Sequence, residues 1–259
     1  MIRTLTRADQ ASAEQNFALK EQLNKLLNAY AGITMPEEKF LEALGLCHEL
    51  TRFLDITRLP KKIRLHGIKH AAKILAHQTK GKREGAAAVS YDKKQKKFHT
   101  ANFTWGTENS VTPNFPKGKD LEPSFVVHNH PDKGITADYI SFFSSTDFEF
   151  FIANPYMQFL VMSTKGRIFL ILKTTKTAAA FIEHNFQQVI AKEHQVLRQK
   201  ETELKRKKKR PLTADEFMEL GSDFNQAICE IFKLGFYSSA PIPNLAYGNQ
   251  PVDLVLLSD

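Results

Sequence analysis

Two histidines one residue apart, followed by a proline, carry the strongest chemical signal in this sequence. His128 and His130 end the apolar run FVVHNHP. Side chains on a strand alternate between faces, so both imidazoles would point the same way while Asn129 points to the other face. Pro131 cannot donate a ladder hydrogen bond, which places the pair near the end of the strand. This arrangement suits a shared metal ion, and a hydrogen-bonded histidine pair is the plainer alternative.

A catalytic zinc ion usually takes three protein ligands and a water, so a third ligand is needed. Asp147 is the first candidate, because a helix that starts at Ser144 would point this first-turn carboxylate back toward the strand end. The same S-x-x-D pattern is also an ordinary helix cap. Asp138 is the alternative third ligand, and Asp132 is a weaker one because it follows the histidines so closely.

A hydrolytic zinc centre also needs a general base near the attacking water, commonly a carboxylate that is not a ligand. Glu84 stands immediately before GAAAVSY, a run of small and apolar residues that favours a strand. Taken alone, Glu84 is read as a solvated loop residue beside Lys82 and Arg83. Its position before that strand makes it the candidate base only in combination with the histidine pair.

In this order, Glu84, His128-Asn-His130-Pro131 and Ser144-x-x-Asp147 resemble the signature of the JAMM (JAB, or MPN-plus) metalloproteases. The HNHP form is most similar to bacterial JAB-domain proteins, including DNA-repair-associated, phage and mobile-element types. The resemblance covers roughly residues 63–173. The spacer of residues 132–143 is longer than the family pattern, which is why Asp138 stays open as a ligand.

The resemblance implies a zinc metallopeptidase that hydrolyses a peptide or isopeptide bond. It makes His128, His130 and Asp147 the ligands of Zn²⁺ and Glu84 the base that deprotonates the bound water. Ser144 would hold the carbonyl oxygen and the oxyanion, a donor worth about 3 kcal/mol in such sites. The implied substrate is a ubiquitin-like protein or another extended peptide, bound as an added strand.

The elements around these residues predict an α+β fold. Strands are expected over 86–91, 98–105, 124–129, 159–162 and 167–173, and helices begin near Ser144 and Thr213. The resemblance implies a JAB/MPN-like (cytidine-deaminase-like) mixed sheet flanked by helices. We therefore divide the chain into an N-terminal helical segment (1–60), a metallopeptidase domain (61–176) and a C-terminal helical extension (177–259).

Three further elements are expected outside the core of that domain. Amphipathic spacing predicts a helix from Ile63 to Gly81, and the capping box at Thr213 opens a helix that is expected to run to about Leu234. The proline-rich tail from Pro241 is expected to be irregular before the short apolar run VDLVLL.

The composition predicts a globular protein with a positive surface. Its 36 Lys and Arg against 28 Asp and Glu give a formal charge of +8, and part of this excess lies in the run from Arg198 to Arg210, which ends in KRKKKR. Only two cysteines occur, which suits a reducing compartment. No apolar stretch approaches the roughly 20 residues of a membrane span, and no secretory signal is evident, so a cytoplasmic location without a membrane partner is expected.

Two other functions compete with the metallopeptidase. One is a non-catalytic scaffold of the same fold, whose helical ends bind a partner. The other is a nucleic-acid-associated module in which Lys205–Arg210 contacts phosphates. Basic runs are more often solvated helix ends, and this one has no interleaved aromatic residues for stacking on bases.

Overall fold

The computed structural model describes most of the chain from residue 61 onward. The described residues are 61–65, 82–92, 94–95, 97–108, 110–130, 142–154, 157, 159–164, 167–174, 176–242 and 252–257, with Leu59 and scattered residues between 18 and 42. The candidate ligands Asp132 and Asp138 lie outside these residues, as do residues 66–81 of the helix expected from Ile63.

The described strands form one mixed nine-stranded sheet in the order β1-β2-β9-β8-β7-β6-β5-β3-β4. The pairs β1/β2 and β5/β6 are parallel, and the other neighbouring pairs are antiparallel. The strand bounds are β1 Thr34–Met35, β2 Lys62–Leu65, β3 Gly85–Asp92, β4 Lys97–Trp105, β5 Leu121–Asn129, β6 Phe159–Thr164, β7 Arg167–Lys173, β8 Leu234–Ser239 and β9 Val252–Leu256.

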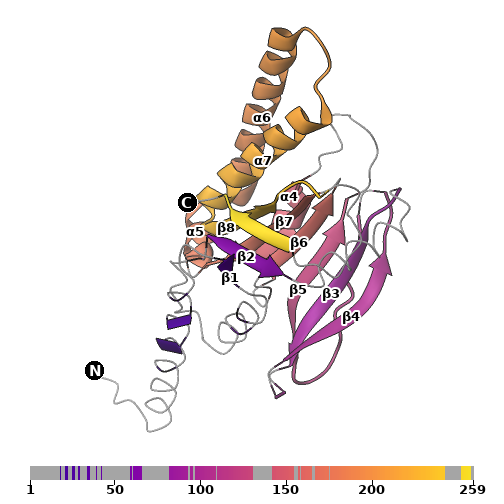
Figure 1. Cartoon of the computed structure of the whole chain (residues 1–259), viewed down its shortest axis with the longest axis vertical. Coiled ribbons are helices and arrows are strands. Elements are labelled where there is room, and N and C mark those ends of the chain that lie inside the picture. Colours follow the sequence, from indigo (N-terminus) through magenta and orange to yellow (C-terminus); the bar gives the residue numbers. More distant parts are fainter. Residues whose placement is uncertain are drawn as a thin grey trace.

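The described helices accompany this sheet, which confirms an α+β architecture. Their bounds are α4 Ser145–Ala153, α5 Thr177–Glu183, α6 Phe186–Lys208 and α7 Ala214–Ile231. The helices α6 and α7 form a hairpin that projects from the sheet (Figure 1). A Lys200–Asp223 ion pair at 2.9 Å joins them.

The central strands are buried on both faces, which explains why they read as continuous apolar runs. On one face, alternate residues such as Ala86, Val126 and Leu160 belong to a core cluster with the phenylalanines of α4 and α7. On the other face, Val127 and Val161 are also buried. His128 belongs to the first of these faces, because it is two residues beyond Val126 on β5.

Three predictions about secondary structure are wrong or incomplete. Ile63 lies in β2, where it is fully buried and pairs with Leu254 of β9, so its apolar character reflects a strand and not a helix start. The helix from Thr213 ends at Ile231, and Lys233 adopts a left-handed backbone (φ 55°) before β8 begins at Leu234. The tail contains the strand β9.

The five strands predicted between residues 86 and 173 are confirmed, with ends that differ by a few residues. The helix starts at Ser144 and Thr213 are confirmed with their capping boxes. The sheet continues into β8 and β9, so these two strands belong to the same sheet as the strands from β2 to β7. Within the part of the chain that the structure describes, none of the helices has the length and hydropathy that a membrane crossing requires.

Lys173, at the end of β7, has a mostly buried side chain that contacts α4. Its ammonium group donates a hydrogen bond to the carbonyl oxygen of Asn154, the C-cap of α4, and lies 4.6 Å from the ring centroid of Phe151. Burial lowers the pKa of Lys173 from its ordinary value of 10.5 to about 7. Above pH 7, Lys173 is therefore mostly deprotonated in the folded protein, while in the unfolded chain it stays protonated up to about pH 10.5.

This difference predicts a pH-dependent stability that substitution of Lys173 removes. Between pH 7 and 10.5 the unfolded chain binds more protons, so the free energy of unfolding should rise with pH by up to about 1.4 kcal/mol per unit. In Lys173→Met the slope of the free energy of unfolding against pH should lose this contribution. In Lys192→Met, which removes an exposed lysine, the slope should equal that of the wild type. Urea unfolding from pH 6 to 9.5 measures it, and equal slopes in wild type and Lys173→Met would refute it.

Candidate metal centre

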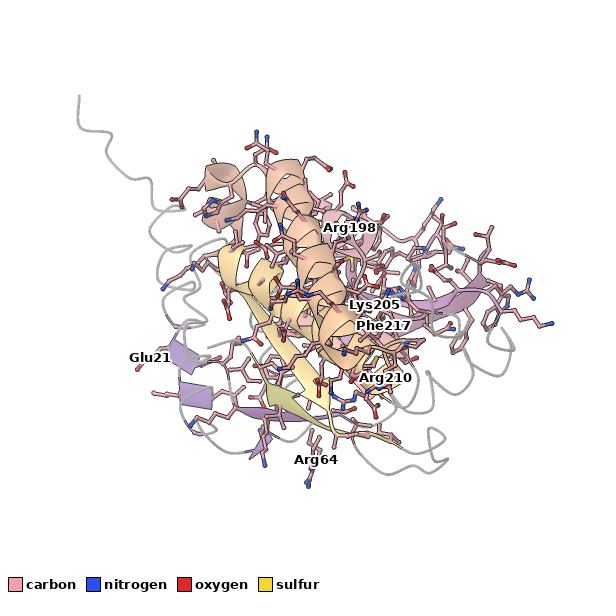
Figure 2. The ribbon with its side chains drawn as sticks, turned by 90° about the horizontal axis from the view of Figure 1, so that it is seen from above. Glu21, Arg64, Arg198, Lys205, Arg210 and Phe217 are labelled. Carbon is pink, nitrogen blue, oxygen red and sulfur yellow. The ribbon has the colours of Figure 1, made fainter. Side chains whose placement is uncertain are left out.

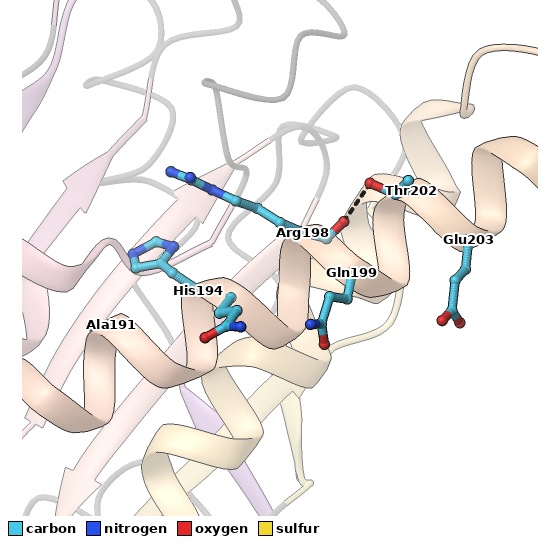
Figure 3. A pocket seen from close by; sticks show the side chains of 7 residues that line it. Ala191, His194, Arg198, Gln199, Thr202 and Glu203 are labelled. Atoms are coloured by element: carbon cyan, nitrogen blue, oxygen red, sulfur yellow. Dashed lines mark hydrogen bonds between the residues drawn. The ribbon is translucent and has the colours of Figure 1, made fainter.

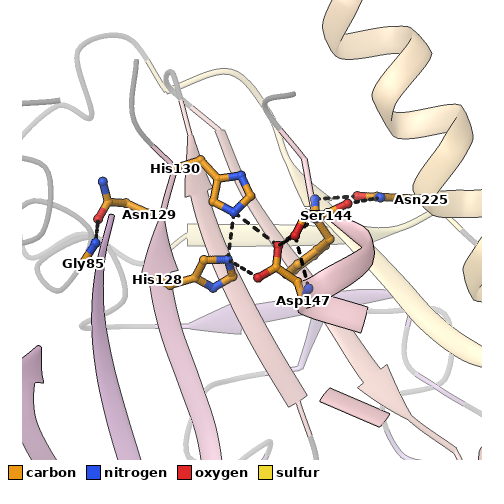
Figure 4. Close-up of polar contacts among 8 residues, drawn as sticks. Gly85, His128, Asn129, His130, Ser144, Asp147 and Asn225 are labelled. Carbon is orange, nitrogen blue, oxygen red and sulfur yellow. Dashed lines mark hydrogen bonds and ion pairs between the residues drawn. The ribbon is translucent and has the colours of Figure 1, made fainter. Parts of the chain in front are cut away.

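Three side chains from two separate segments meet at one end of the sheet. The Nε2 atoms of His128 and His130 lie 3.2 Å apart, and each lies 3.2 Å from a different oxygen of Asp147 (Figure 4). All three are largely enclosed, with side-chain exposures of 4%, 11% and 19%. Among the described residues this is the group of His, Cys, Asp and Glu side chains that could hold a metal ion.

The spacing of these atoms matches a metal site. Two ligands at 2.0–2.1 Å from a tetrahedral ion are separated by about 3.3 Å. The two Nε2 atoms are 3.2 Å apart, and each lies 3.2 Å from one oxygen of the carboxylate, Oδ1 for His128 and Oδ2 for His130. With one ligand atom taken from each residue, all three atoms lie within 4.8 Å of one another. Hydrogen bonding alone fits less well, because protons on both Nε2 atoms would oppose each other while both nitrogens also face one carboxylate. The donor set of two imidazoles and a carboxylate fits a divalent ion such as zinc.

Asp147 reaches the histidines because of the way α4 begins. Ser144 is the N-cap, and its hydroxyl accepts a hydrogen bond from the Asp147 amide at 3.2 Å. In return, Oδ2 of Asp147 accepts from the Ser144 amide at 2.7 Å and from the Ser144 hydroxyl at 2.8 Å. The capping box thus fixes the carboxylate at the helix start, with Oδ1 directed at His128. Capping and ligation are compatible roles for this one residue.

The histidines favour the ionised form of Asp147. Burial alone would raise its pKa, but without a metal the protonated imidazoles of His128 and His130, by their charges and their hydrogen bonds to the carboxylate, hold the pKa of Asp147 well below its usual range. An ionised carboxylate is the form that ligates a metal.

The histidines are presented by β5, whose register also places Glu84. His128 pairs with Ala86, and Asn129 pairs with Gly85, on the neighbouring antiparallel strand β3. Glu84 immediately precedes β3 and His130 immediately follows β5, so the two residues lie at the same end of the sheet. A register continued by one residue beyond both strands would set Glu84 opposite His130, on the sheet face of the histidines.

The backbone around Glu84 is held on both sides. Its amide donates to the Thr107 carbonyl at 2.8 Å, and its carbonyl accepts from the Gly106 amide at 2.9 Å. The next amide, that of Gly85, donates to Oδ1 of Asn129 at 2.9 Å. A Cβ at Gly106 would lie 2.0 Å from the Ser110 carbonyl oxygen, so only glycine allows this close approach. These contacts hold the backbone of the half-buried Glu84 at the sheet end that carries the histidines.

Ser144 also lies at the centre, where its described contacts are those of a helix cap. Its hydroxyl donates to Oδ2 of Asp147 and so orients the carboxylate. The structure thus brings together His128, His130, Asp147 and Ser144, and it places Glu84 at the same sheet end. Asp147 and Asp138 are the main alternatives for the third ligand. Asp147 lies beside the histidines, and Asp138 is outside the described residues.

Sequence reasoning missed residues that hold this arrangement from a distance. Asn225, on α7, hydrogen-bonds to the backbone of Phe143, and Asn129 holds the start of β3. A polar residue on the apolar face of α7, next to Phe224 and Ile228, is a signal that could have identified Asn225, although it gives no partner. His130 is further fixed by its own amide, which donates to the Ser163 carbonyl of β6 at 3.3 Å.

Many cations of the run 198–210 are paired within the α6–α7 hairpin. Lys205 contacts Glu201 at 2.6 Å, while Arg210 and Lys208 contact Glu216 at 2.8 and 3.4 Å. Figure 2 shows Arg198, Lys205 and Arg210 along α6 and just beyond its end. These pairs give the basic run a structural role in the hairpin, and phosphate binding by it stays a prediction.

A groove of about 700 Å³, separate from the candidate metal centre, runs along one side of α6. Its described lining consists of Ala191, His194, Gln195, Arg198, Gln199, Thr202 and Glu203 (Figure 3). Burial and the charge of Arg198 lower the pKa of His194, whose ring lies 4.7 Å from that of Phe224. None of the predicted site residues lines this groove.

Comparisons with known proteins add no relative. No family model matches the chain, and neither a curated protein nor a solved structure matches it. The chemistry of the centre therefore rests on its own geometry.

The geometry predicts that the protein binds about one divalent ion per chain. Replacing His128 and His130 together with alanine should abolish binding, and Asp147→Asn should weaken it at least 10-fold because the carboxylate charge is lost. His194→Ala, on α6, is the matched control and should retain the metal. Metal analysis after dialysis and a zinc titration measure these outcomes. Full occupancy in the double-alanine variant would show that the ion binds elsewhere.

Proposed function

We propose that the protein is a zinc-dependent metallopeptidase of the JAMM/JAB type, which hydrolyses a peptide or isopeptide bond. The observation that carries this proposal is the meeting of two imidazole nitrogens, 3.2 Å apart, with one carboxylate whose two oxygens each lie 3.2 Å from one of those nitrogens. The order of Glu84, the H-x-H-P segment and the S-x-x-D segment, with their matching strand and helix positions, supports it further.

Each residue has a role that its position supports. His128, His130 and Asp147 would hold the zinc ion, which when bound lowers the pKa of a water molecule and polarises a carbonyl group. Glu84, at the same end of the sheet, would accept the proton of the attacking water and return it to the leaving amine. Enclosure of the ligands excludes bulk solvent and strengthens these electrostatic interactions.

Ser144 contributes first by orienting Asp147. Its hydroxyl hydrogen is directed at Oδ2 of that carboxylate, so donation to a substrate carbonyl or an oxyanion requires the hydroxyl to rotate. We therefore assign Glu84 the larger share of the chemical step. Ser144 takes the oxyanion role once substrate is bound.

A purely structural scaffold explains the centre less well. Enclosing two imidazoles and a carboxylate together costs solvation free energy, which well-packed apolar residues of similar volume would not. The neighbouring core, with Phe143 and Phe148 fully buried, shows that this region can be filled by apolar side chains. Ionisable groups gathered at such a cost are characteristic of functional sites.

The proposed substrate is an extended peptide, such as the tail of a ubiquitin-like protein. Among the described strands, β4 ends the sheet order beyond β3. A peptide paired with β4 would lie about three strand spacings, roughly 14 Å, from β5. Its scissile bond would therefore lie in residues that leave the pairing and cross the sheet end toward His128 and His130.

Substitution of the base separates catalysis from metal binding. Glu84→Gln should retain zinc and lower the rate of peptide cleavage by about 10²–10⁴-fold, because the amide cannot accept the proton of water. Glu149→Gln, an exposed position on α4 with the same change in charge, is the control and should cleave normally. Mass spectrometry of a library of unstructured peptides and of ubiquitin-like fusion proteins measures cleavage. Unchanged turnover by Glu84→Gln would remove Glu84 from the mechanism.

A further inference from the structure

A buried asparagine on α7 binds the segment that leads into the metal centre. The Asn225 side chain is fully buried, and both of its polar ends contact the backbone of Phe143. Its Oδ1 accepts from the Phe143 amide at 3.0 Å, and its Nδ2 donates to the Phe143 carbonyl at 2.9 Å (Figure 4). One side chain thus pairs with both backbone groups of a residue that lies outside the described strands and helices.

These two hydrogen bonds matter because Phe143 is itself fully buried. A buried backbone group without a partner costs about 1–3 kcal/mol, so this segment needs the amide of Asn225 to remain in place. The requirement is directional as well, because an amide fits the donor and the acceptor of Phe143 in only one orientation.

A second contact from α7 fixes the preceding residue. The ring of Phe142 packs against the backbone at Gly221, where a Cβ would lie only 1.6 Å from the ring. The Phe142 ring also lies 5.6 Å from the ring of Phe224. Gly221, Phe224 and Asn225 stand three and four residues apart, so they share one face of α7. This face binds Phe142 and Phe143 side by side.

The consequence reaches the third ligand through a short covalent path. Phe143 precedes Ser144, the N-cap of α4, and the capping box fixes Asp147 relative to Ser144. Phe143 also contacts the histidine side of the centre, with its ring 6.0 Å from that of His128. A shift of Phe143 would therefore move the carboxylate relative to both imidazoles.

We propose that Asn225 is a positioning residue, through which α7 sets the affinity of the metal centre. This inference rests on the proposed metal site and extends it, because it makes the helix from Ala214 to Ile231 a part of the centre. Partners that hold metal ligands in place typically change metal affinity by about 10–100-fold when they are replaced.

The test compares zinc affinity across three variants of α7. Asn225→Leu keeps the branched shape of the side chain and removes both hydrogen bonds, and Gly221→Ala displaces the Phe142 ring. Cys229→Ala, one turn beyond Asn225 and equally buried, is the control for lost packing in the same helix. Zinc dissociation constants, measured by competition with a chromophoric chelator on folded protein, should rise at least 10-fold in the first two variants. The control should stay within about 2-fold of wild type.

If Asn225 had a purely structural role, its substitution would lower the free energy of unfolding but leave the zinc dissociation constant of the folded protein unchanged. Loss of activity in Asn225→Leu should be recovered by excess zinc, with KM for the peptide unchanged, because the substrate contacts are intact. Should Asn225→Leu fail to fold, Asn225→Asp and Gly221→Ala decide the outcome by the same titration. Wild-type zinc affinity in a folded variant, or an equal loss in Cys229→Ala, would overturn the positioning role. A wild-type protein that binds no zinc would instead refute the proposed function.

Discussion

Two imidazole nitrogens that lie 3.2 Å apart, each 3.2 Å from a different oxygen of one carboxylate, constrain the rest of the structure. These groups compete for the same protons, and enclosure removes the water that would otherwise solvate them. A divalent cation would resolve the conflict, because it could bind all three side chains at once without a proton on either Nε2 nitrogen. The surrounding elements can be understood as the supports that keep three ligand atoms at this spacing.

The supports come from distant parts of the chain. The end of β5 presents both histidines, and the neighbouring end of β3 presents Glu84. The start of α4 presents Asp147, and α7 holds the two residues before that helix. The α6–α7 hairpin therefore contacts, through α7, the segment that leads into the candidate centre, and β8 and β9 continue the sheet. The domain boundary expected at residue 176 therefore divides one sheet and separates α7 from the Phe143 backbone to which it is hydrogen-bonded.

The candidate ligands could be predicted from the sequence because their signals are local. H-x-H at a strand end and S-x-x-D at a helix start each specify a face or a direction within a few residues. Asn225 and Phe143 are 82 residues apart, and nothing in either segment encodes the other. Gly106 is similar, since its need for glycine arises from a contact with Ser110 in a loop without regular structure.

The fold was predictable to the same extent and for the same reason. Long apolar runs such as 124–129 and 167–173 gave the right strands. The strands β2 and β8 were not predicted, because they adjoin sequences with helical spacing. Ile63 and Leu234 fit that helical spacing as well as they fit a strand. Lys233 adds to the difficulty: it ends α7 in a left-handed conformation that is uncommon for residues other than glycine.

Anomalous diffraction at the zinc edge, from crystals grown with one equivalent of zinc, tests the proposed centre most directly. The expected result is a single strong peak about 2.0–2.1 Å from Nε2 of His128, Nε2 of His130 and a carboxylate oxygen of Asp147. A peak bound by other residues, with the three side chains still in contact through hydrogen bonds alone, would contradict it.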